Sequence, residues 1–300
     1  MNHQPVTQLQ IDQRVYDLYD EYCHGKIDRR EYLKRASALA VLGIPALAMA
    51  TSLLPQYAQA QTISFTDPRI KASYVTYPSP GGNGETMRGY LVQPAGTGPF
   101  PAVLIIHENR GLNPYIEDVA RRAAAAGYLA LAPDGLAPLG GYPGNDDDGR
   151  TMQAKLDQVK LRTDMLNGAN WLKAHKLSTG KLGVTGFCWG GRITWLYAEQ
   201  SKNVKAGVAW YGRLVGTPNP LQPKNPVDMA AQINAPVLGL YGEKDGGIPL
   251  ASVDQMKAAL LDAGGKGNAA AKASEFVIYP DAPHAFHADY RPSYRKEAAD

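Results

Sequence analysis

The sequence predicts an α/β fold in which a mostly parallel β-sheet carries helices on both faces, as a three-layer sandwich. Short apolar runs alternate with longer amphipathic segments from about residue 100 to residue 280, a pattern typical of strands joined by crossover helices. One run, Pro101–Ile106, is almost entirely apolar, as expected for a strand buried on both faces. The functional site of such a sheet lies at the carboxyl ends of its strands.

The region before this alternation predicts an antiparallel pair of strands. Apolar residues alternate along Ile70–Tyr77 and again along Thr86–Gln93, and the stretch between them is rich in Gly, Pro, Ser and Asn, as in a connecting loop. After the buried strand, Asn113 and Pro114 supply an N-cap and a first-turn proline for a helix that extends to Ala126.

The rest of the chain continues the alternation of strands and helices. We expect strands at Tyr128–Ala132, Lys181–Gly186, Ala206–Tyr211, Pro236–Tyr241 and Glu275–Tyr279, and helices at Thr151–Ala174, Gly190–Glu199 and Ala251–Ala263. The final residues, Ser293–Asp300, resemble the opening of the helix that normally closes such a sheet, so the sequence predicts a shortened last helix.

Length and composition predict one catalytic domain. The chain has 300 residues, of which 44% are hydrophobic, enough for one substantial core, and we assign this core to residues 61–300. The formal charge of +3 is small and its basic residues are dispersed. Nucleic acid is therefore not an expected partner, because it would need a concentrated basic face. We expect a small-molecule partner and favour a monomer.

Residues 1–60 have the features of an N-terminal extension followed by a twin-arginine export signal. The pair Arg29-Arg30 precedes a mildly apolar run over residues 36–54, and Ala58-Gln59-Ala60 offers the small residues that a signal peptidase accepts. We expect export to the periplasm, cleavage near Ala60, and membrane contact only during export. The alternative is an uncleaved anchor, although Pro and Gly interrupt the apolar run.

Cysteine usage directs attention to a single thiol. The chain contains only Cys23 and Cys188, and Cys23 lies in the predicted leader. The mature chain would hold one cysteine and no internal disulfide. An exported lone thiol is prone to oxidation unless it is buried or has a function, which favours a functional interpretation of Cys188.

The strongest motif surrounds Cys188. Gly186-Phe187-Cys188-Trp189-Gly190-Gly191 follows a predicted strand and precedes a predicted helix, which resembles the nucleophile elbow of α/β-hydrolases with Cys in place of Ser. The glycines allow the chain to turn sharply around a strained nucleophile. The helix N-terminus favours a thiolate and offers the N–H of Trp189 to an oxyanion. A buried structural cysteine is the alternative.

A thiol nucleophile needs a base and an acid that orients the base. His284 follows the last predicted strand, where this fold delivers its histidine, and His287 is the rival three residues later. Asp245 follows the preceding strand and is favoured over Glu243 as the orienting acid. A carboxylate at position 245 could instead cap the following helix.

Glu108 is an unusual residue for its predicted position. It follows the first buried strand, in the loop that normally supplies an N–H to the oxyanion. A carboxylate there would face the nucleophile and disfavour the thiolate, so it could keep Cys188 protonated until something moves. An ion pair between Glu108 and Arg110 is the alternative interpretation.

The acidic run Asn145-Asp146-Asp147-Asp148-Gly149 invites comparison with a calcium loop. It lacks the spaced ligands and the closing glutamate of an EF-hand loop. We therefore expect a solvated loop at this position, no metal site and no cofactor.

Together, Glu108, the cysteine elbow, Asp245 and Pro283-His284-Ala285-Phe286 resemble the dienelactone hydrolase (carboxymethylenebutenolidase) family of the α/β-hydrolase superfamily. The similarity extends from about residue 70 to the end of the chain. The resemblance implies that Cys188 attacks a carbonyl carbon, His284 moves protons and Asp245 orients His284.

The resemblance further implies that Glu108 pairs with the resting thiol and gates its activation when substrate binds. The N–H groups of Trp189 and Asn109 would form the oxyanion hole, and water would release the acyl group. The implied activity is hydrolysis of a small ester or lactone.

One departure from the family concerns substrate binding. Family members that act on dienelactone bind its carboxylate with arginines, one of them four residues after the histidine, where this chain has Ala288. Arg110, His287 or Arg291 could substitute. The other functions that the sequence leaves open are an inactive or binding protein on a hydrolase scaffold, and a general thioesterase or peptidase.

Overall fold

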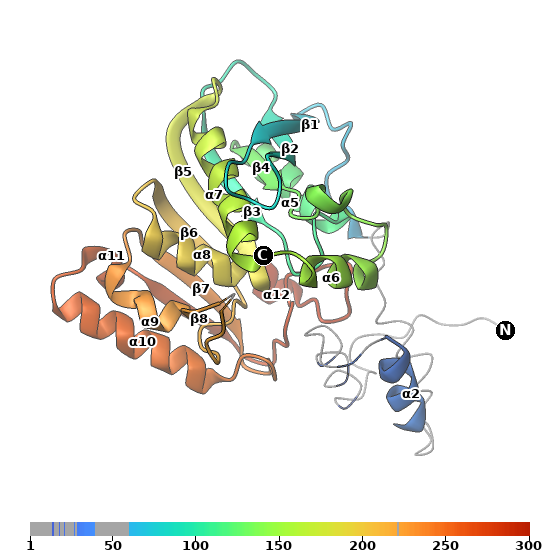
Figure 1. The fold of residues 1–300 in the computed structure, drawn as a ribbon, viewed down its shortest axis with the longest axis vertical. Helices are drawn as coiled ribbons and strands as arrows, with labels where there is room; N and C mark the ends of the chain where they lie inside the picture. Colours follow the sequence, from blue (N-terminus) through green and yellow to red (C-terminus); the bar gives the residue numbers. More distant parts are fainter. Residues whose placement is uncertain are drawn as a thin grey trace.

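An eight-stranded β-sheet forms the centre of the fold (Figure 1). The computed structural model describes residues 29–39, 60–220 and 222–300, and four isolated positions before residue 28. The strands are β1 (Ile70–Pro78), β2 (Thr86–Pro94), β3 (Phe100–Ile106), β4 (Leu129–Pro133), β5 (Ser178–Phe187), β6 (Val204–Trp210), β7 (Val237–Gly242) and β8 (Glu275–Tyr279).

The sheet order is β1-β2-β4-β3-β5-β6-β7-β8. β2 pairs antiparallel with both β1 and β4, and every other neighbouring pair is parallel. This mostly parallel sheet, with the antiparallel strands confined to one edge, confirms the predicted α/β-hydrolase fold class. All five residues of β4 are buried, as expected for a strand that is covered on both faces.

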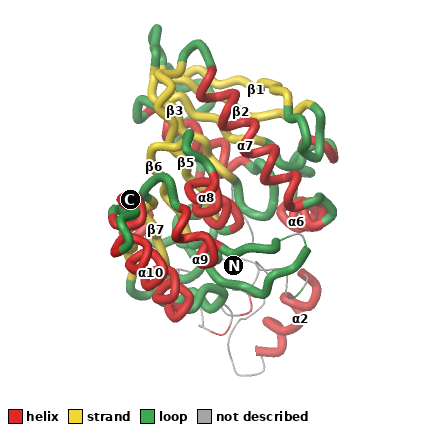
Figure 2. The backbone as a smooth tube through the Cα atoms, turned by 60° about the vertical axis from the view of Figure 1, so that its left-hand side comes forward, coloured by secondary structure: helices red, strands yellow, loops and turns green. Residues whose placement is uncertain are grey.

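Helices cover the sheet and connect its strands (Figures 1 and 2). In the view of Figure 1, α7 and α8 lie in front of the sheet and α5 lies behind it. The α-helices are α2 (Arg29–Leu39), α5 (Pro114–Ala125), α6 (Asp146–Ala154), α7 (Gln158–Ala174), α8 (Trp189–Gln200), α9 (Pro226–Met229), α10 (Leu250–Gly265), α11 (Ala269–Lys272) and α12 (Lys296–Ala299). Two short 3-10 helices, η3 (Ala137–Leu139) and η4 (Ala230–Gln232), complete the set that the described residues form.

The predicted strands and most of the predicted helices match observed elements within a few residues. The N-cap of α5 is as predicted, because the Asn113 side chain accepts a hydrogen bond from the Ile116 N–H. The short α12 occupies part of the segment Ser293–Asp300, where the sequence predicted the opening of a helix.

One predicted helix was wrong. The segment Thr151–Ala174 is not continuous, since α6 ends at Ala154 and α7 begins at Gln158. Asp157 is the N-cap of α7, and its carboxylate accepts hydrogen bonds from the N–H groups of Val159 and Lys160. This cap satisfies donors that a helix start otherwise leaves unpaired, so the chain starts a new helix.

The acidic run was also predicted incorrectly, because it is not a solvated loop. Asn145 caps α6 by accepting a hydrogen bond from the Asp148 N–H, and three aspartates form the first turn of that helix. Negative charge is favourable at a helix N-terminus. Asp146 is only 7% exposed, and its partners are described with the candidate site.

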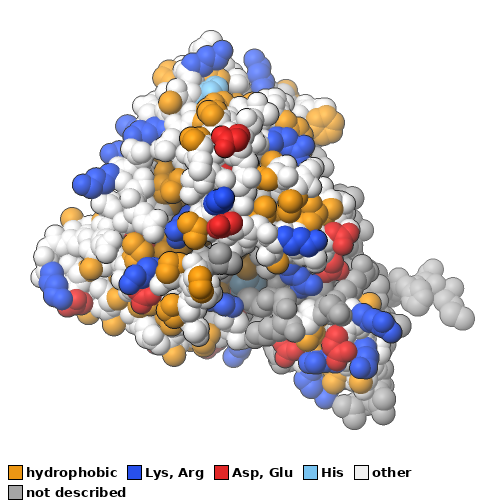
Figure 3. Space-filling view, viewed as in Figure 1, with side chains coloured by type: hydrophobic (Ala, Val, Ile, Leu, Met, Phe, Trp, Pro, Cys, Tyr) orange, Lys and Arg blue, Asp and Glu red, His pale blue; other side chains and the backbone are white. Residues whose placement is uncertain are grey.

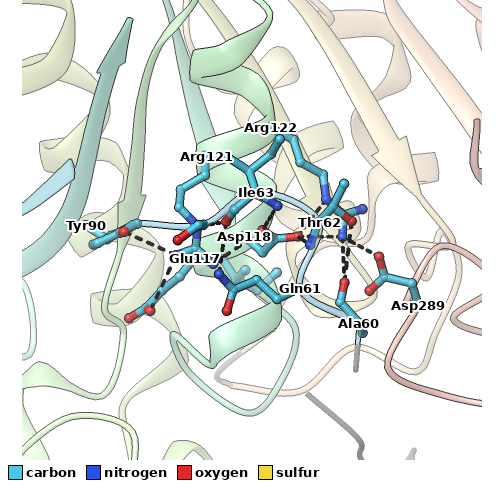
Figure 4. A network of polar contacts seen from close by, with 12 residues as sticks. Ala60, Gln61, Thr62, Ile63, Tyr90, Glu117, Asp118, Arg121, Arg122 and Asp289 are labelled. Atoms are coloured by element: carbon cyan, nitrogen blue, oxygen red, sulfur yellow. Dashed lines mark hydrogen bonds and ion pairs between the residues drawn. The ribbon is translucent and has the colours of Figure 1, made fainter. Parts of the chain in front are cut away.

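The segment that follows the predicted cleavage point is anchored to α5 (Figure 4). The N–H groups of Thr62 and Ile63 donate to the two carboxylate oxygens of Asp118, at 3.0 and 2.9 Å. Arg121 donates through Nε to the Ile63 carbonyl at 2.6 Å. Because Asp118 and Arg121 are nearly fully buried, these charge-assisted bonds hold the backbone of the segment firmly.

Arg122 extends this anchor toward the C-terminal part of the chain (Figure 4). Its guanidinium donates to Asp118 and forms an ion pair with Asp289. Burial lowers the pKa of Arg122, but Asp118 and Asp289 outweigh this and raise the pKa above its usual value. The start of the domain is thus tied by charge to the segment that follows β8.

The surface shown in Figure 3 carries Lys and Arg side chains interspersed with acidic and apolar ones. No helix within the described ranges is both long enough and apolar enough to span a membrane. Cys23 and residues 40–59, which hold most of the predicted export signal, lie outside the described residues.

Glu199, near the end of α8, is a buried acid whose carboxylate oxygens have no hydrogen-bond partner among the described residues. It is 2% exposed. Burial raises the pKa of Glu199 well above its usual value of 4.5, although the positive charge of Arg192 opposes the shift. The folded protein therefore retains a proton that the unfolded chain releases, and stability decreases as the pH rises above about 4.5.

We predict that Glu199→Gln stabilises the protein at neutral pH. The variant removes the titration, so its gain in free energy of unfolding should grow by about 1.4 kcal/mol per pH unit between the unfolded and folded pKa values. Urea denaturation between about pH 4 and pH 8 measures this gain. The exposed Glu275→Gln is the control, and an equal, pH-independent effect of both variants would contradict the prediction.

Candidate active site

Cys188 occupies a sharp turn between β5 and α8, as the elbow motif predicted. Its backbone has φ 54° and ψ −109°, a conformation that is strained for a residue with a side chain. Its N–H donates to the Trp210 carbonyl at 3.0 Å, and its carbonyl accepts from Arg192 N–H at 3.1 Å. The side chain is partly exposed, at the carboxyl end of β5.

Two glycines make this turn possible. A Cβ atom on Gly186 would lie 2.3 Å from the Gly190 carbonyl oxygen, and one on Gly190 would lie 2.2 Å from the Ile106 carbonyl oxygen. Both contacts are with backbone atoms that cannot easily move. The small residues two positions before and after Cys188 therefore allow the elbow to pack against the end of β3.

His284 and Asp245 meet as predicted from different loops. His284 Nδ1 lies 2.7 Å from Asp245 Oδ2, and both side chains are buried. Since a carboxylate only accepts hydrogen bonds, Nδ1 donates and Nε2 is directed elsewhere. Burial lowers the pKa of His284, but Asp245 and Cys188 outweigh it through charge and hydrogen bonding, and raise the pKa well above its usual range.

The second carboxylate oxygen of Asp245 stabilises the loop that contains this residue. Oδ1 accepts hydrogen bonds from the N–H groups of Gly247 and Ile248, both at 3.0 Å. Asp245 does not cap the next helix, as the alternative interpretation had it, because the N-cap residue of α10 is Pro249. The carboxylate is therefore fixed in place and oriented toward His284.

The rival residues lie elsewhere. Glu243 is exposed and contacts Lys244 and the Asp281 N–H. His287 packs in an aromatic cluster, with its ring 4.4 Å from that of Trp210. Burial, together with Arg122, lowers the pKa of His287 to about 3, so this ring is neutral at ordinary pH. The structure does not bring His287 into the cavity at Cys188.

His107 fixes the loop after β3, and the sequence analysis did not identify it. Its Nε2 accepts from the Gly135 N–H at 3.1 Å, so Nδ1 donates to the Glu108 carbonyl at 2.5 Å. Burial lowers the pKa of His107, which keeps the ring neutral. The ring also stacks on Trp189. His107 thus connects the loop that contains Asn109 to the start of α8.

Glu108 is buried beside Arg291, which the sequence analysis named as a possible substrate-binding residue. Arg291 donates to Glu108 Oε2 at 2.7 Å, and the Tyr290 hydroxyl donates to the same oxygen at 3.1 Å. The predicted alternative, a pair between Glu108 and Arg110, is not formed. Arg110 instead places Nε 3.2 Å from Asp146 Oδ2, and Arg291 lies 3.6 Å from that same oxygen.

A cavity of about 130 Å³ opens at the thiol. It is lined by Asn109, Cys188, Trp189, Arg192, Tyr211, Arg213, Gln222, Ile248 and His284. A volume near 150 Å³ holds one benzene-sized molecule, so the cavity suits a small ring or a short acyl chain. Asn109 and Trp189 lie in the wall, as expected for oxyanion donors, whereas Arg110 and Arg291 do not.

Five lining residues were missed by the sequence analysis, and Tyr211, Arg213 and Arg192 are the three with a recognisable position in the sequence. Tyr211 follows β6 with a positive φ of 39°, and its ring packs edge-on against His284. Arg213 follows two residues later, and Arg192 lies on the first turn of α8. Their position after a strand end or after the nucleophile was the available signal.

Comparison with known proteins identifies the family. A model of the dienelactone hydrolase family matches residues 87–300. The chain belongs to the dienelactone hydrolase family. It is a hydrolase of the carboxymethylenebutenolidase-like class. A second model, described as YqhI-like, matches residues 4–41.

Relatives of this dienelactone hydrolase family member cover most of the chain. A "Putative carboxymethylenebutenolidase" of Methylorubrum extorquens is 46% identical over 258 residues, which are 84% of this chain and 85% of the relative. A protein of the same name from Escherichia coli is 42% identical over 239 residues, which are 78% of this chain and 84% of the relative.

Solved structures agree with this assignment. A "Putative Dienelactone Hydrolase" from Klebsiella pneumoniae is 41% identical, has a TM-score of 0.64, and covers 76% of this chain and 94% of its own. A dienelactone hydrolase-like promiscuous phosphotriesterase from metagenomic libraries has a TM-score of 0.59 at 22% identity, with 77% of this chain and 93% of its own covered. The latter similarity supports the fold alone.

We predict that Asp245→Asn removes a pH-dependent part of the stability. The pKa of His284 is raised in the folded protein. At a pH above about 6.5, the pKa of histidine in the unfolded chain, the protein therefore takes up a proton when it folds. This stabilisation is complete below about pH 6.5 and is lost as the pH rises through the folded pKa. The wild type should therefore exceed the variant in free energy of unfolding by more at about pH 6 than at about pH 9.

Urea denaturation at the two pH values measures the difference. Asp281→Asn is the matched control, because Asp281 is an exposed carboxylate three residues before His284. A difference between wild type and Asp245→Asn that stays constant with pH would show that the His284 proton is not held by Asp245.

Proposed function

We propose that this protein hydrolyses a small ester or lactone with Cys188 as nucleophile, His284 as proton carrier and Asp245 as the group that orients His284. One observation carries the proposal: a buried imidazole, held by the Asp245 carboxylate, lines the same small cavity as the Cys188 side chain. The family supports a carboxylic ester substrate, and the cavity volume supports a small one.

The proposed reaction proceeds through a thioester. The thiolate of Cys188, paired with the imidazolium of His284, attacks the carbonyl carbon and forms a C–S bond. The N–H groups of Trp189 and Asn109 stabilise the resulting oxyanion. The C–O bond to the alcohol or enol oxygen then breaks, and His284 donates the proton that this oxygen needs.

Water completes the cycle. His284, now neutral, accepts a proton from a water molecule as that water attacks the thioester carbonyl carbon. The C–S bond breaks, the carboxylic acid leaves, and the thiolate-imidazolium pair is restored. Asp245 keeps the imidazole in one tautomer and orientation through both steps.

We predict that Cys188→Ala abolishes turnover of 4-nitrophenyl butyrate. Removal of a nucleophile costs about 10⁴-fold or more in kcat when no other group replaces it. Release of 4-nitrophenol measures the rate, and circular dichroism checks that the variant is folded. Turnover that survives in a folded Cys188→Ala variant would refute the assignment.

Glu108 is proposed to control the reactivity of the thiol. In this structure its carboxylate is held by Arg291 and Tyr290, and Cys188 and His284 line the same cavity. If the Glu108 carboxylate moved from Arg291 toward Cys188, it would accept a hydrogen bond from the thiol, and its negative charge would disfavour the thiolate. In the resting state Glu108 would then contact the thiol of Cys188, and in the active state it would contact Arg291.

We predict that Glu108→Gln increases the rate at which iodoacetamide modifies Cys188 at neutral pH, by about threefold or more, because one nearby negative charge is lost. Thiol modification is followed by mass spectrometry. Asp146→Asn is the control, since it removes a carboxylate from the same buried network. No acceleration in Glu108→Gln, or an equal acceleration in both variants, would contradict the gating role.

Export through the twin-arginine route with cleavage near Ala60 remains a proposal. It is supported by the arginine pair and the Ala58-Gln59-Ala60 sequence. Cleavage at that point would leave residues 61–63 attached to Asp118 and Arg121. The mature chain would therefore begin at its anchored segment.

A further inference from the structure

The loop between β6 and α9 supplies part of the wall of the cavity at Cys188. The structure describes residues 211–220 and 222–225 of this loop. Tyr211, Arg213 and Gln222 from the loop line the cavity. Tyr211 and Arg213 come soon after the end of β6, but Gln222 lies much further along the chain. The position of Gln222 in the wall therefore depends on the path that the loop takes.

Arg192 connects this loop to the helix that begins beside the nucleophile. Its guanidinium donates through Nη1 to Asn225 Oδ1 at 3.0 Å and through Nη2 to the Lys224 carbonyl at 2.7 Å. Burial and the charges of Arg213 and Arg162 lower the pKa of Arg192 to about 10, so the side chain is charged at neutral pH. Hydrogen bonds from a charged, planar guanidinium are strong and directional. Arg192 therefore fixes the end of the loop against α8.

Asn225 extends this restraint to the outer part of the loop. Its side chain is buried, and its Nδ2 donates to the Gly216 carbonyl at 2.7 Å. One carboxamide thus contacts both Arg192 and the backbone nine residues earlier in the loop. Asn225 is not among the described residues that line the cavity. Any influence of Asn225 on a substrate must therefore act through the loop.

A short turn at the outer end of the loop holds the backbone of Gln222. The Gln222 N–H donates to the Asn219 carbonyl at 3.0 Å, and the Asn219 N–H donates to the Gln222 carbonyl at 3.1 Å. Asn219 Oδ1 also accepts from the Gln222 N–H, at 2.9 Å. This turn lies between Gly216 and Asn225, which the Asn225 carboxamide joins. The carboxamide therefore determines where the turn places Gln222.

We propose that Gln222 limits the size of the group that enters the cavity beside the reacting carbonyl, and that Asn225, held by Arg192, is the positioning residue that keeps Gln222 in the wall. This inference rests on the hydrolase function proposed above. The cavity is small, at about 130 Å³. A wall excludes larger groups only if neighbouring residues hold it in place, and the contacts of Asn225 provide this support.

The experiment compares uncharged esters that differ only in size. 4-Nitrophenyl butyrate and 4-nitrophenyl octanoate have the same leaving group and differ in the acyl chain. Phenyl acetate and 1-naphthyl acetate have the same acyl group and differ in the alcohol. The readout is the ratio of kcat/KM for the smaller ester over the larger ester within each pair. It is measured in wild type, Gln222→Ala, Asn225→Asp and the double variant, and thermal unfolding checks that each protein is folded.

We predict that wild type favours the smaller ester in at least one pair, and that Gln222→Ala lowers this ratio about tenfold, the order by which a pocket discriminates one methylene group. Asn225→Asp keeps an oxygen that accepts from Arg192 but loses the amide donor to Gly216. It should lower the same ratio. In the double variant Asn225→Asp should add little to Gln222→Ala, because both changes act through one wall.

Asn268→Asp is the matched control for the positioning residue. Asn268 is also the N-cap of a short helix, α11, and its Nδ2 donates to the Ile233 carbonyl at 3.0 Å. It is not among the described residues that line the cavity. Asn268→Asp should therefore leave the ratio as in wild type. An equal fall of the ratio in Asn268→Asp would refute the positioning role of Asn225, because a general loosening of the fold would then explain it.

The outcomes separate this inference from the proposed function. If wild type hydrolyses the esters without preferring the smaller one in either pair, or Gln222→Ala keeps the wild-type ratio, the size limit is refuted while the hydrolase function stands. If Asn225→Asp keeps the wild-type ratio, or lowers it equally with and without Gln222, the positioning role is refuted. If wild type turns over none of the four esters, or Cys188→Ala turns them over equally well, the proposed function itself fails.

Discussion

The strained backbone of Cys188 is the constraint on which the rest of the site depends. Its positive φ turns the chain from β5 directly into α8, and Gly186 and Gly190 allow the close backbone contacts that this turn requires. The turn presents the thiol at the sheet edge, at the start of a helix whose N-terminus favours negative charge. It also places Trp189 and Arg192 in the wall of the same cavity.

Three buried acids around this turn each have a defined cationic or protonated partner. Asp245 contacts His284, Glu108 contacts Arg291, and Asp146 contacts Arg110. Such pairs are retained because removing one member leaves a buried charge uncompensated. The consequence is functional: the protein's own acids occupy Arg110 and Arg291, and the cavity retains the positive charge of Arg192 and Arg213.

Local patterns predicted most of the fold, because strands, turns and caps depend on neighbouring residues. The elbow at Cys188 and the positions of His284 and Asp245 were predicted in the same way, because each follows the end of a predicted strand. The structure brings the side chains of His284 and Asp245 together. The sequence did not predict which acidic residue each buried arginine contacts. The fold pairs Arg110 with Asp146, 36 residues away along the sequence, and nothing in the local pattern indicates such a contact. Arg213 was missed because only the folded cavity distinguishes it from a surface arginine.

The central claim, that Cys188 carries the acyl group, is tested most directly by trapping the intermediate. Wild-type protein is mixed with excess 4-nitrophenyl butyrate, quenched in acid within the first turnover, and analysed by intact-mass and peptide mass spectrometry. The account predicts a mass increase of one butyryl group on the peptide that contains Cys188, reversed when the sample is left at neutral pH before quenching. A butyryl group on another residue, or turnover with no acylated protein under any quenching time, would contradict it.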